Sequence, residues 1–99
     1  MSVCIKFTFA MERYVRITIS GKVQGVGFRY SALKRAGSLG IRGSVRNMPD
    51  GSVYIEAAGR DQDIGKFLEW CHQGPPLARV DKVSIDEGYD NNYRGFVIK

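Results

Sequence analysis

Residues 21–29, GKVQGVGFR, combine three glycines with one arginine and contain no acidic side chain. Gly21, Gly25 and Gly27 can adopt positive φ angles, so successive backbone N–H groups can converge on one point and bind an anion. Arg29 ends the stretch, and its planar guanidinium can donate two parallel hydrogen bonds to phosphate oxygens. The stretch therefore predicts a phosphate-binding loop.

Two established loop motifs do not match this stretch. A Walker A motif requires Gly-Lys-Ser/Thr after the loop, and that sequence is absent. The G-x-G-x-x-G pattern also fails, because Tyr30 stands three residues after Gly27 where that pattern needs glycine or alanine. On the glycine pattern alone, a tight strand-to-helix connection without function is the alternative.

Asn47 is the second candidate for chemistry. It follows Val45 on the same face of an expected strand and precedes a Met-Pro-Asp-Gly turn at 48–51. A carboxamide both donates and accepts hydrogen bonds, so it can orient a water molecule. The alternative role is a turn cap, which asparagine often provides next to such a turn.

The other titratable residues do not predict a metal site or an acid–base pair. His72 is the only histidine, and we expect it at the surface near the end of a helix. The acidic residues are spread over loops and strand ends without paired spacing. We therefore expect neither a metal nor another cofactor.

The loop is expected to lie between a strand and a helix. Residues 13–20, RYVRITIS, alternate apolar and polar side chains as a half-buried strand does. From Phe28 the apolar residues recur at helical spacing, and Gly40 stands at the position of a helix C-terminal cap. The unpaired N–H groups and positive dipole end of that helix would face the same anion.

The rest of the chain predicts a hairpin, a second helix and further strands. Residues 41–59 are two strand-like runs around the turn, in which proline and glycine supply the required angles. Asp61 or Asp63 is expected to cap a helix that ends at Gly74. A strand over 78–86 changes apolar parity, which predicts a bulge, and residues 94–99 can add a short strand.

This order, β-α-β-β-α-β with an extra short strand, predicts an α+β protein. Right-handed crossovers place both helices on one face of a mainly antiparallel sheet, which is the ferredoxin-like sandwich. We expect one domain over residues 13–99, preceded by an extension over 1–12 whose role the sequence leaves open.

Composition narrows the partners and the compartment. The chain has 99 residues, a net charge of +5 and a pI near 9.5, which favours an anionic partner without selecting one. No apolar run reaches the roughly 20 residues of a membrane span, and the first residues form a poor secretory signal. Only Cys4 and Cys71 are present, so we expect free thiols and cytoplasmic residence.

Three segments closely resemble the acylphosphatases: GKVQGVGFR at 21–29, GSVRNMPDGSVYIEAAG at 43–59 and GPPLARVDKV at 74–83. The resemblance covers about residues 14–98 and implies hydrolysis of the carboxyl–phosphate bond of small acyl phosphates, without metal or cofactor. It implies that Arg29 binds the phosphoryl group and that Asn47 orients the attacking water. The residues whose backbone N–H groups would bind the phosphate are Gln24, Gly25, Val26, Gly27 and Phe28. Inorganic phosphate, the product, would inhibit competitively.

Two other functions compete with hydrolysis. A basic ferredoxin-like domain can bind single-stranded RNA on its sheet. The RGFVIK segment at 94–99 resembles part of the RNP1 motif of such domains, but that motif belongs on the third strand. The third strand here offers Tyr54 as its one stacking ring. The phosphate site could instead be regulatory, as in acylphosphatase-like domains of larger carbamoyl-transfer enzymes, although we expect no further domain here. We expect a monomer that binds neither nucleic acid nor membrane.

Overall fold

The computed structural model describes residues 12–90 and 92–99, which form one five-stranded sheet and two helices. In chain order the elements are β1 (Glu12–Lys22), α2 (Phe28–Ser38), β2 (Arg42–Asn47), β3 (Val53–Arg60), α3 (Asp61–Gln73), β4 (Arg79–Glu87) and β5 (Phe96–Ile98). The predicted element order and the short last strand are confirmed. Glu12 already belongs to β1, and the remainder of the expected extension, 1–11, lies outside the described residues.

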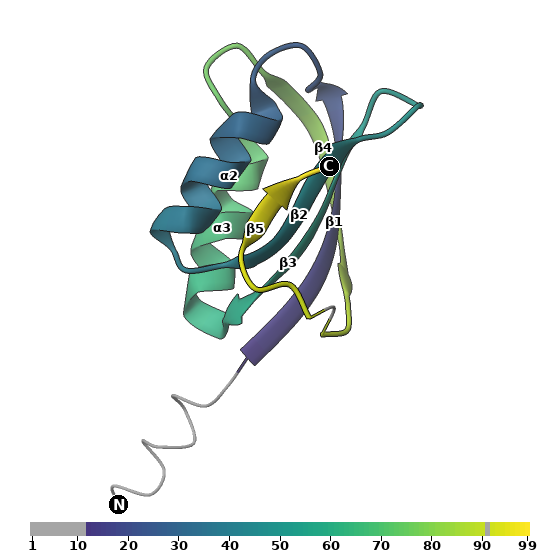
Figure 1. The fold of residues 1–99 in the computed structure, drawn as a ribbon. Helices are drawn as coiled ribbons and strands as arrows, with labels where there is room; N and C mark the ends of the chain where they lie inside the picture. Colours follow the sequence, from purple (N-terminus) through teal and green to yellow (C-terminus); the bar gives the residue numbers. More distant parts are fainter. Residues whose placement is uncertain (1–11, 91) are drawn as a thin grey trace, which may run out of the picture.

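The sheet has the strand order β4-β1-β3-β2-β5 and is mainly antiparallel, with a parallel pair only between β2 and β5. Both helices cover the same face, so the α+β ferredoxin-like fold is confirmed (Figure 1). β3 runs antiparallel to both β1 and β2, so these two strands point the same way. Their carboxyl ends, which carry the glycine loop and Asn47, therefore meet at one end of the sheet.

The core fills the space between the sheet and the helices. Alternation along a strand sends every second side chain to this face. The buried apolar side chains of β1 and β3 are Val15, Ile17, Ile19, Val53, Ile55 and Ala57. Ile64, Phe67 and Cys71 of α3 are completely buried against them and form the apolar face of that helix.

The predicted bulge is present in β4 and explains Gly21. Ser20 lies opposite Lys82 and Gly21 opposite Val80, so Asp81 is the extra residue. Gly21 has a φ of 129°, and a Cβ added there would lie 2.2 Å from the Arg79 carbonyl oxygen. The expectation that Gly21 shapes the phosphate loop is therefore wrong: it lies within β1, where two backbones approach closely.

Of the two helix caps that the sequence predicted, the structure contains the glycine cap at the end of α2 and lacks the aspartate cap at the start of α3. After α2, Ile41 N–H donates to the Ala36 carbonyl and Gly40 N–H to the Gly37 carbonyl, which is a Schellman motif with Gly40 at φ 67°. The expectation that an aspartate caps α3 is wrong. Arg60 is the N-cap and makes no side-chain cap, while both aspartates lie in the first turn, where carboxylates favour the helix dipole.

Neither described helix is long and apolar enough to cross a membrane.

Candidate active site

A cavity of about 240 Å³ lies at the end of the sheet where β1 and β2 terminate. Arg29 and Asn47, which are 18 positions apart in the sequence, both line it, together with Gly25 and Gly27 of the loop. The parallel direction of β1 and β2 produces this juxtaposition, because it places the loop after one strand beside the end of the other.

The loop between β1 and α2 has the conformation of an anion-binding nest. Gly25 has a φ of 76° and Gly27 a φ of 80°, whereas Val26 between them does not have a positive φ. Alternation of the sign of φ turns successive N–H groups toward one side of the chain. A Cβ at either glycine would meet no atom within 4 Å, so the backbone angle rather than space demands glycine there.

The first turn of α2 adds further free N–H groups to the same cavity. Gly27 is the N-cap, no side chain caps the helix, and the first turn contains no acidic residue. The first helical hydrogen bond runs from Ser31 N–H to the Gly27 carbonyl, at 3.0 Å. The N–H groups of residues 28–30 therefore have no partner within the helix, and the positive end of the dipole points toward any anion in the cavity.

Phe28 anchors this junction to the core. Its side chain is 2% exposed, and its ring centroid lies 5.2 Å from that of Trp70 on α3. An aromatic pair of this kind contributes about 0.5–1.5 kcal/mol beyond area burial. The start of α2 is thus held by apolar packing instead of a polar cap, which leaves its N–H groups free.

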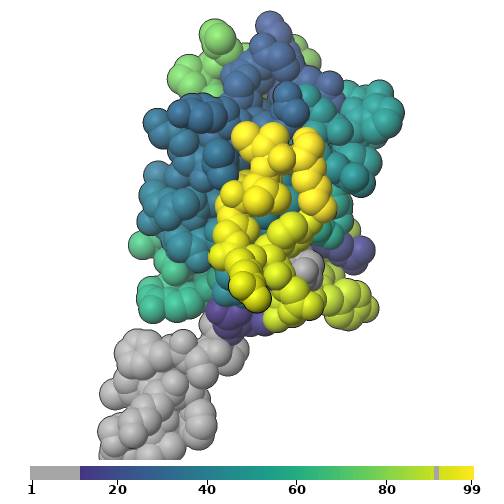
Figure 2. All heavy atoms as spheres, viewed as in Figure 1, coloured from purple at the N-terminus to yellow at the C-terminus, as the bar shows by residue number. Residues whose placement is uncertain are grey.

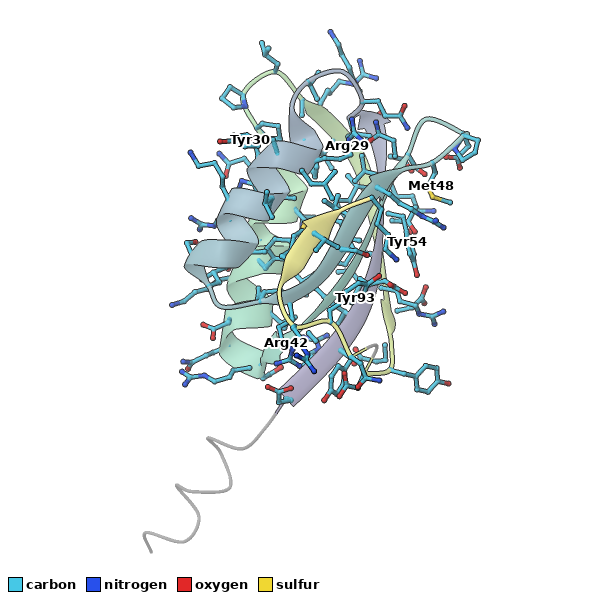
Figure 3. The ribbon with its side chains drawn as sticks, viewed as in Figure 1. Arg29, Tyr30, Arg42, Met48, Tyr54 and Tyr93 are labelled. Atoms are coloured by element: carbon cyan, nitrogen blue, oxygen red, sulfur yellow. The ribbon has the colours of Figure 1, made fainter. Side chains whose placement is uncertain are left out.

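Arg29 is an exposed arginine without an internal partner. Within residues 12–90 and 92–99 it forms no ion pair and no side-chain hydrogen bond, whereas Arg42 and Arg79 each pair with a carboxylate at 3.0 Å. Arg29 and the adjacent Tyr30 leave α2 in different directions (Figure 3). The Arg29 guanidinium therefore keeps all of its donors available to a ligand in the cavity.

Asn47 does not cap the turn that follows it. Asp50 performs that function, because its Oδ1 accepts hydrogen bonds from Ser52 N–H at 2.9 Å and Ser52 Oγ at 2.6 Å. These bonds lower the pKa of Asp50, the hydroxyl contributing most. In the described part of the chain, the Asn47 side chain makes no hydrogen bond, although it is half-buried and lines the cavity.

Two of the five predicted loop residues do not line the cavity. Val26 packs against the core, and the Gln24 amide turns toward the β2–β3 turn. Gln24 Nε2 donates to the Met48 carbonyl at 2.8 Å and to the Ser52 carbonyl at 2.9 Å. The Gln24 side chain thus ties the loop to the turn beside Asn47.

Sequence reasoning missed Ile98 as a lining residue. β5 pairs in parallel with β2, and Val45 lies opposite Ile98, so the C-terminal strand forms one wall of the cavity. Figure 2 shows this yellow segment on the surface beside the blue α2. Apolar spacing predicted the strand, but no local signal indicates which strand it pairs with.

Among the described residues, the cysteine and the histidine do not line the cavity. Cys71 is fully buried in the core, and this burial raises the pKa of its thiol to about 12. The His72 ring nitrogen Nδ1 lies 2.9 Å from the Leu68 carbonyl oxygen and therefore donates to it, near the end of α3. No cluster of three metal-ligating side chains occurs among residues 12–90 and 92–99.

The family model described as Acylphosphatase matches residues 15–98. An acylphosphatase of Acaryochloris marina is 50% identical over 84 residues, which are 85% of this chain and 90% of that protein. The structure of an acylphosphatase from Coxiella burnetii superposes with a TM-score of 0.86 at 39% identity, covering 89% of this chain and 93% of that one. The acylphosphatase structure from Bacillus subtilis gives a TM-score of 0.85 at 34% identity, covering 90% and 99%.

The Gln24 bonds generate a prediction. In Gln24→Met the side chain keeps its length but donates to neither carbonyl, so we expect a loss of about 1–3 kcal/mol of unfolding free energy and weaker binding of inorganic phosphate. Thermal unfolding and an NMR phosphate titration measure the two effects. Gln73→Met, at an exposed position in the last turn of α3, is the control and should change neither. Unchanged phosphate affinity in Gln24→Met would show that this tie does not position the loop.

Proposed function

This chain belongs to the acylphosphatase family and hydrolyses acyl phosphates to carboxylate and inorganic phosphate, and we propose that Arg29, the loop 24–28 and Asn47 perform the reaction. The observation that carries this assignment is the single cavity lined by Arg29, Asn47 and the two loop glycines. This cavity brings together hydrogen-bond donors that can bind an anion and a carboxamide that can orient water.

The loop and Arg29 bind the phosphoryl group. The nest at residues 25–27 and the uncapped first turn of α2 supply backbone N–H donors, and the unpaired guanidinium supplies a planar pair. Phosphoryl transfer needs in-line positioning and stabilisation of charge on the equatorial oxygens, and fixed donors provide both. Gly25 and Gly27 contribute through their backbone, so the substrate can approach without meeting a side chain.

Asn47 orients the attacking water. Its carboxamide can accept a hydrogen bond from the water while the water oxygen points at phosphorus. The new bond forms between this oxygen and phosphorus as the bond from phosphorus to the carboxyl oxygen breaks, and its electron pair leaves with the carboxylate. One water proton passes to a phosphoryl oxygen, so that carboxylate and inorganic phosphate are the products.

The leaving group explains why no acidic side chain is required in the cavity. A carboxylic acid has a pKa of about 4 to 5, so its carboxylate departs at neutral pH without protonation. An alkoxide from a phosphate monoester would need a general acid. The cavity therefore suits acyl phosphates and not alkyl phosphates.

We also propose a cytoplasmic monomer that acts on a small acyl phosphate, without a nucleic-acid partner. The loop glycines, Arg29 and Asn47 come together within one chain, which supports activity without a second copy. Two cysteines in 99 residues do not form the dense disulfide framework of small secreted domains. On the open face of the sheet, β1 and β3 offer the rings of Tyr14 and Tyr54, which are not adjacent, because Tyr14 lies opposite Ala58, four residues along β3 from Tyr54. RNA-binding sheets instead stack two or three bases on neighbouring aromatic rings.

The direct test of the function is an assay with benzoyl phosphate and an alkyl phosphate monoester, each with excess chelator. We expect hydrolysis of benzoyl phosphate unaffected by chelation, little action on the monoester, and competitive inhibition by inorganic phosphate. Loss of activity on chelation would contradict the mechanism. Non-competitive inhibition would place the anion site outside this cavity.

Replacement of Arg29 tests the planar donor pair. In Arg29→Lys the charge remains, but an ammonium cannot present two parallel donors in a fixed plane, so most activity and phosphate affinity should be lost. Steady-state kinetics with phosphate inhibition measures both. Arg35→Lys, on an exposed part of the same helix, should behave as wild type. Near-normal turnover of Arg29→Lys would mean that a point charge is sufficient.

Replacement of Asn47 separates water orientation from phosphate binding. By analogy with loss of one preorganised polar group from another hydrolase, turnover of Asn47→Ala should fall by roughly 10²- to 10³-fold, with nearly unchanged phosphate inhibition. The matched variant is Asp50→Ala, which removes the actual turn cap. It should lose about 1 kcal/mol of stability and keep its turnover per folded molecule. Normal kcat in Asn47→Ala would rule out its catalytic role.

A further inference from the structure

A second hollow, of about 290 Å³, lies on the face of the sheet opposite the helices. Ser44, Arg46, Tyr54 and Glu56 point to this face, because they alternate along β2 and β3 with the core residues of the other face. Figure 3 shows Met48 and Tyr54 on this side of the sheet. Neither Arg29 nor Asn47 lines this hollow, so it is separate from the proposed active site.

The strand register divides the hollow into two ends. Ser44 lies opposite Glu56, and Arg46 lies opposite Tyr54, one side-chain repeat further along the strands. Lys99 follows the Val45–Ile98 pair and its N–H donates to the Val45 carbonyl, which places Lys99 beside Arg46. A cationic end and an acceptor end therefore lie about 7 Å apart, the distance of two residues along a strand.

Ser44 presents a hydroxyl to the hollow that is available to a ligand. The residue is 3% exposed, yet its hydroxyl forms no hydrogen bond with any residue of the described part of the chain. Every completely enclosed side-chain nitrogen or oxygen there has a partner, so the Ser44 hydroxyl must be reachable from outside, and Ser44 lines the hollow. A ligand in the hollow can therefore exchange hydrogen bonds with this hydroxyl in place of water.

The charged groups of the hollow are not neutralised by one another. The Glu56 carboxylate accepts weak hydrogen bonds from the Tyr54 and Tyr93 hydroxyls, at 3.4 and 3.5 Å, and pairs with no cation of residues 12–90 and 92–99. Arg46 lies over the Tyr54 ring at 5.8 Å, also without a carboxylate partner. Lys99 lies over the Tyr93 ring at 5.0 Å. The hollow thus offers a carboxylate, an aromatic wall and two cations in sequence.

We propose that this hollow binds a purine nucleoside monophosphate with guanine as the base. Guanine has two adjacent N–H donors that match the two oxygens of Glu56, and its ring can pack on Tyr54. The phosphate would lie at Arg46 and Lys99, and the Ser44 hydroxyl would bond to the polar edge of the base. The volume is close to the lower limit of ligand pockets, roughly 300 Å³, which suits a small metabolite.

The test is an NMR titration of the ¹⁵N-labelled full chain with GMP, beside a separate titration with inorganic phosphate that identifies the shifts of the catalytic loop. We expect saturable shifts at Ser44, Arg46, Tyr54 and Glu56, and UMP should bind at least about 10-fold more weakly because uracil lacks the paired donors. Shifts confined to residues 24–30, no saturation by about 10 mM GMP, or equal binding of UMP would each overturn the proposal. Tighter binding of an oligoribonucleotide than of GMP would make the face an RNA surface instead.

Substitutions in the hollow test which side chains contact GMP. Glu56→Gln should weaken GMP binding by about 10- to 100-fold, which corresponds to the loss of hydrogen bonds to a charged group. Ser44→Ala should weaken it by about 2- to 10-fold without lowering the thermal midpoint, since its hydroxyl bonds to no described residue of the chain. Arg94→Gln, an exposed charge that does not line the hollow, is the control and should bind as wild type. A lowered midpoint with unchanged binding in Ser44→Ala would give that hydroxyl a structural role and contradict the proposal.

Discussion

The absence of a polar cap at the start of α2 is the constraint on which the candidate active site depends. A helix that begins with free N–H groups gives up a stabilising contact of about 1 kcal/mol. Here the Phe28 ring, packed against Trp70, holds the first turn in place instead. The unpaired donors, the glycine nest and the Arg29 guanidinium can then act together on one anion, because no side chain of residues 12–90 and 92–99 bonds to them.

A second constraint is the placement of the β2–β3 turn beside that loop. Gln24 donates to two carbonyls of the turn, and Asp50 closes the turn internally through Ser52. With these bonds made by its neighbours, the Asn47 side chain at the end of β2 has no hydrogen-bond partner among the described residues. The polar side chain that orients water in the proposed mechanism is thus free because its neighbours supply the local hydrogen bonds.

β2 serves different purposes on its two faces. Val45 points into the core, Asn47 at the strand end lines the cavity, and Ser44 and Arg46 line the hollow on the opposite face. The alternation of side chains along a strand makes this division possible without a second domain. The same short strand therefore connects two separate concave surfaces of a 99-residue chain.

Local patterns in the sequence were sufficient for the elements, the bulge in β4, the loop and the family resemblance, because periodicity, glycine and proline act within a few residues. They were wrong about Gly21 and about the aspartate cap of α3, since only the neighbouring strand and the actual first helical residue decide those roles. Tertiary structure alone brought Arg29 and Asn47 to one cavity, made Ile98 its wall and gave the turn cap to Asp50. These features depend on strand order and register, which are set by contacts between segments far apart in the chain and leave no local trace in the sequence.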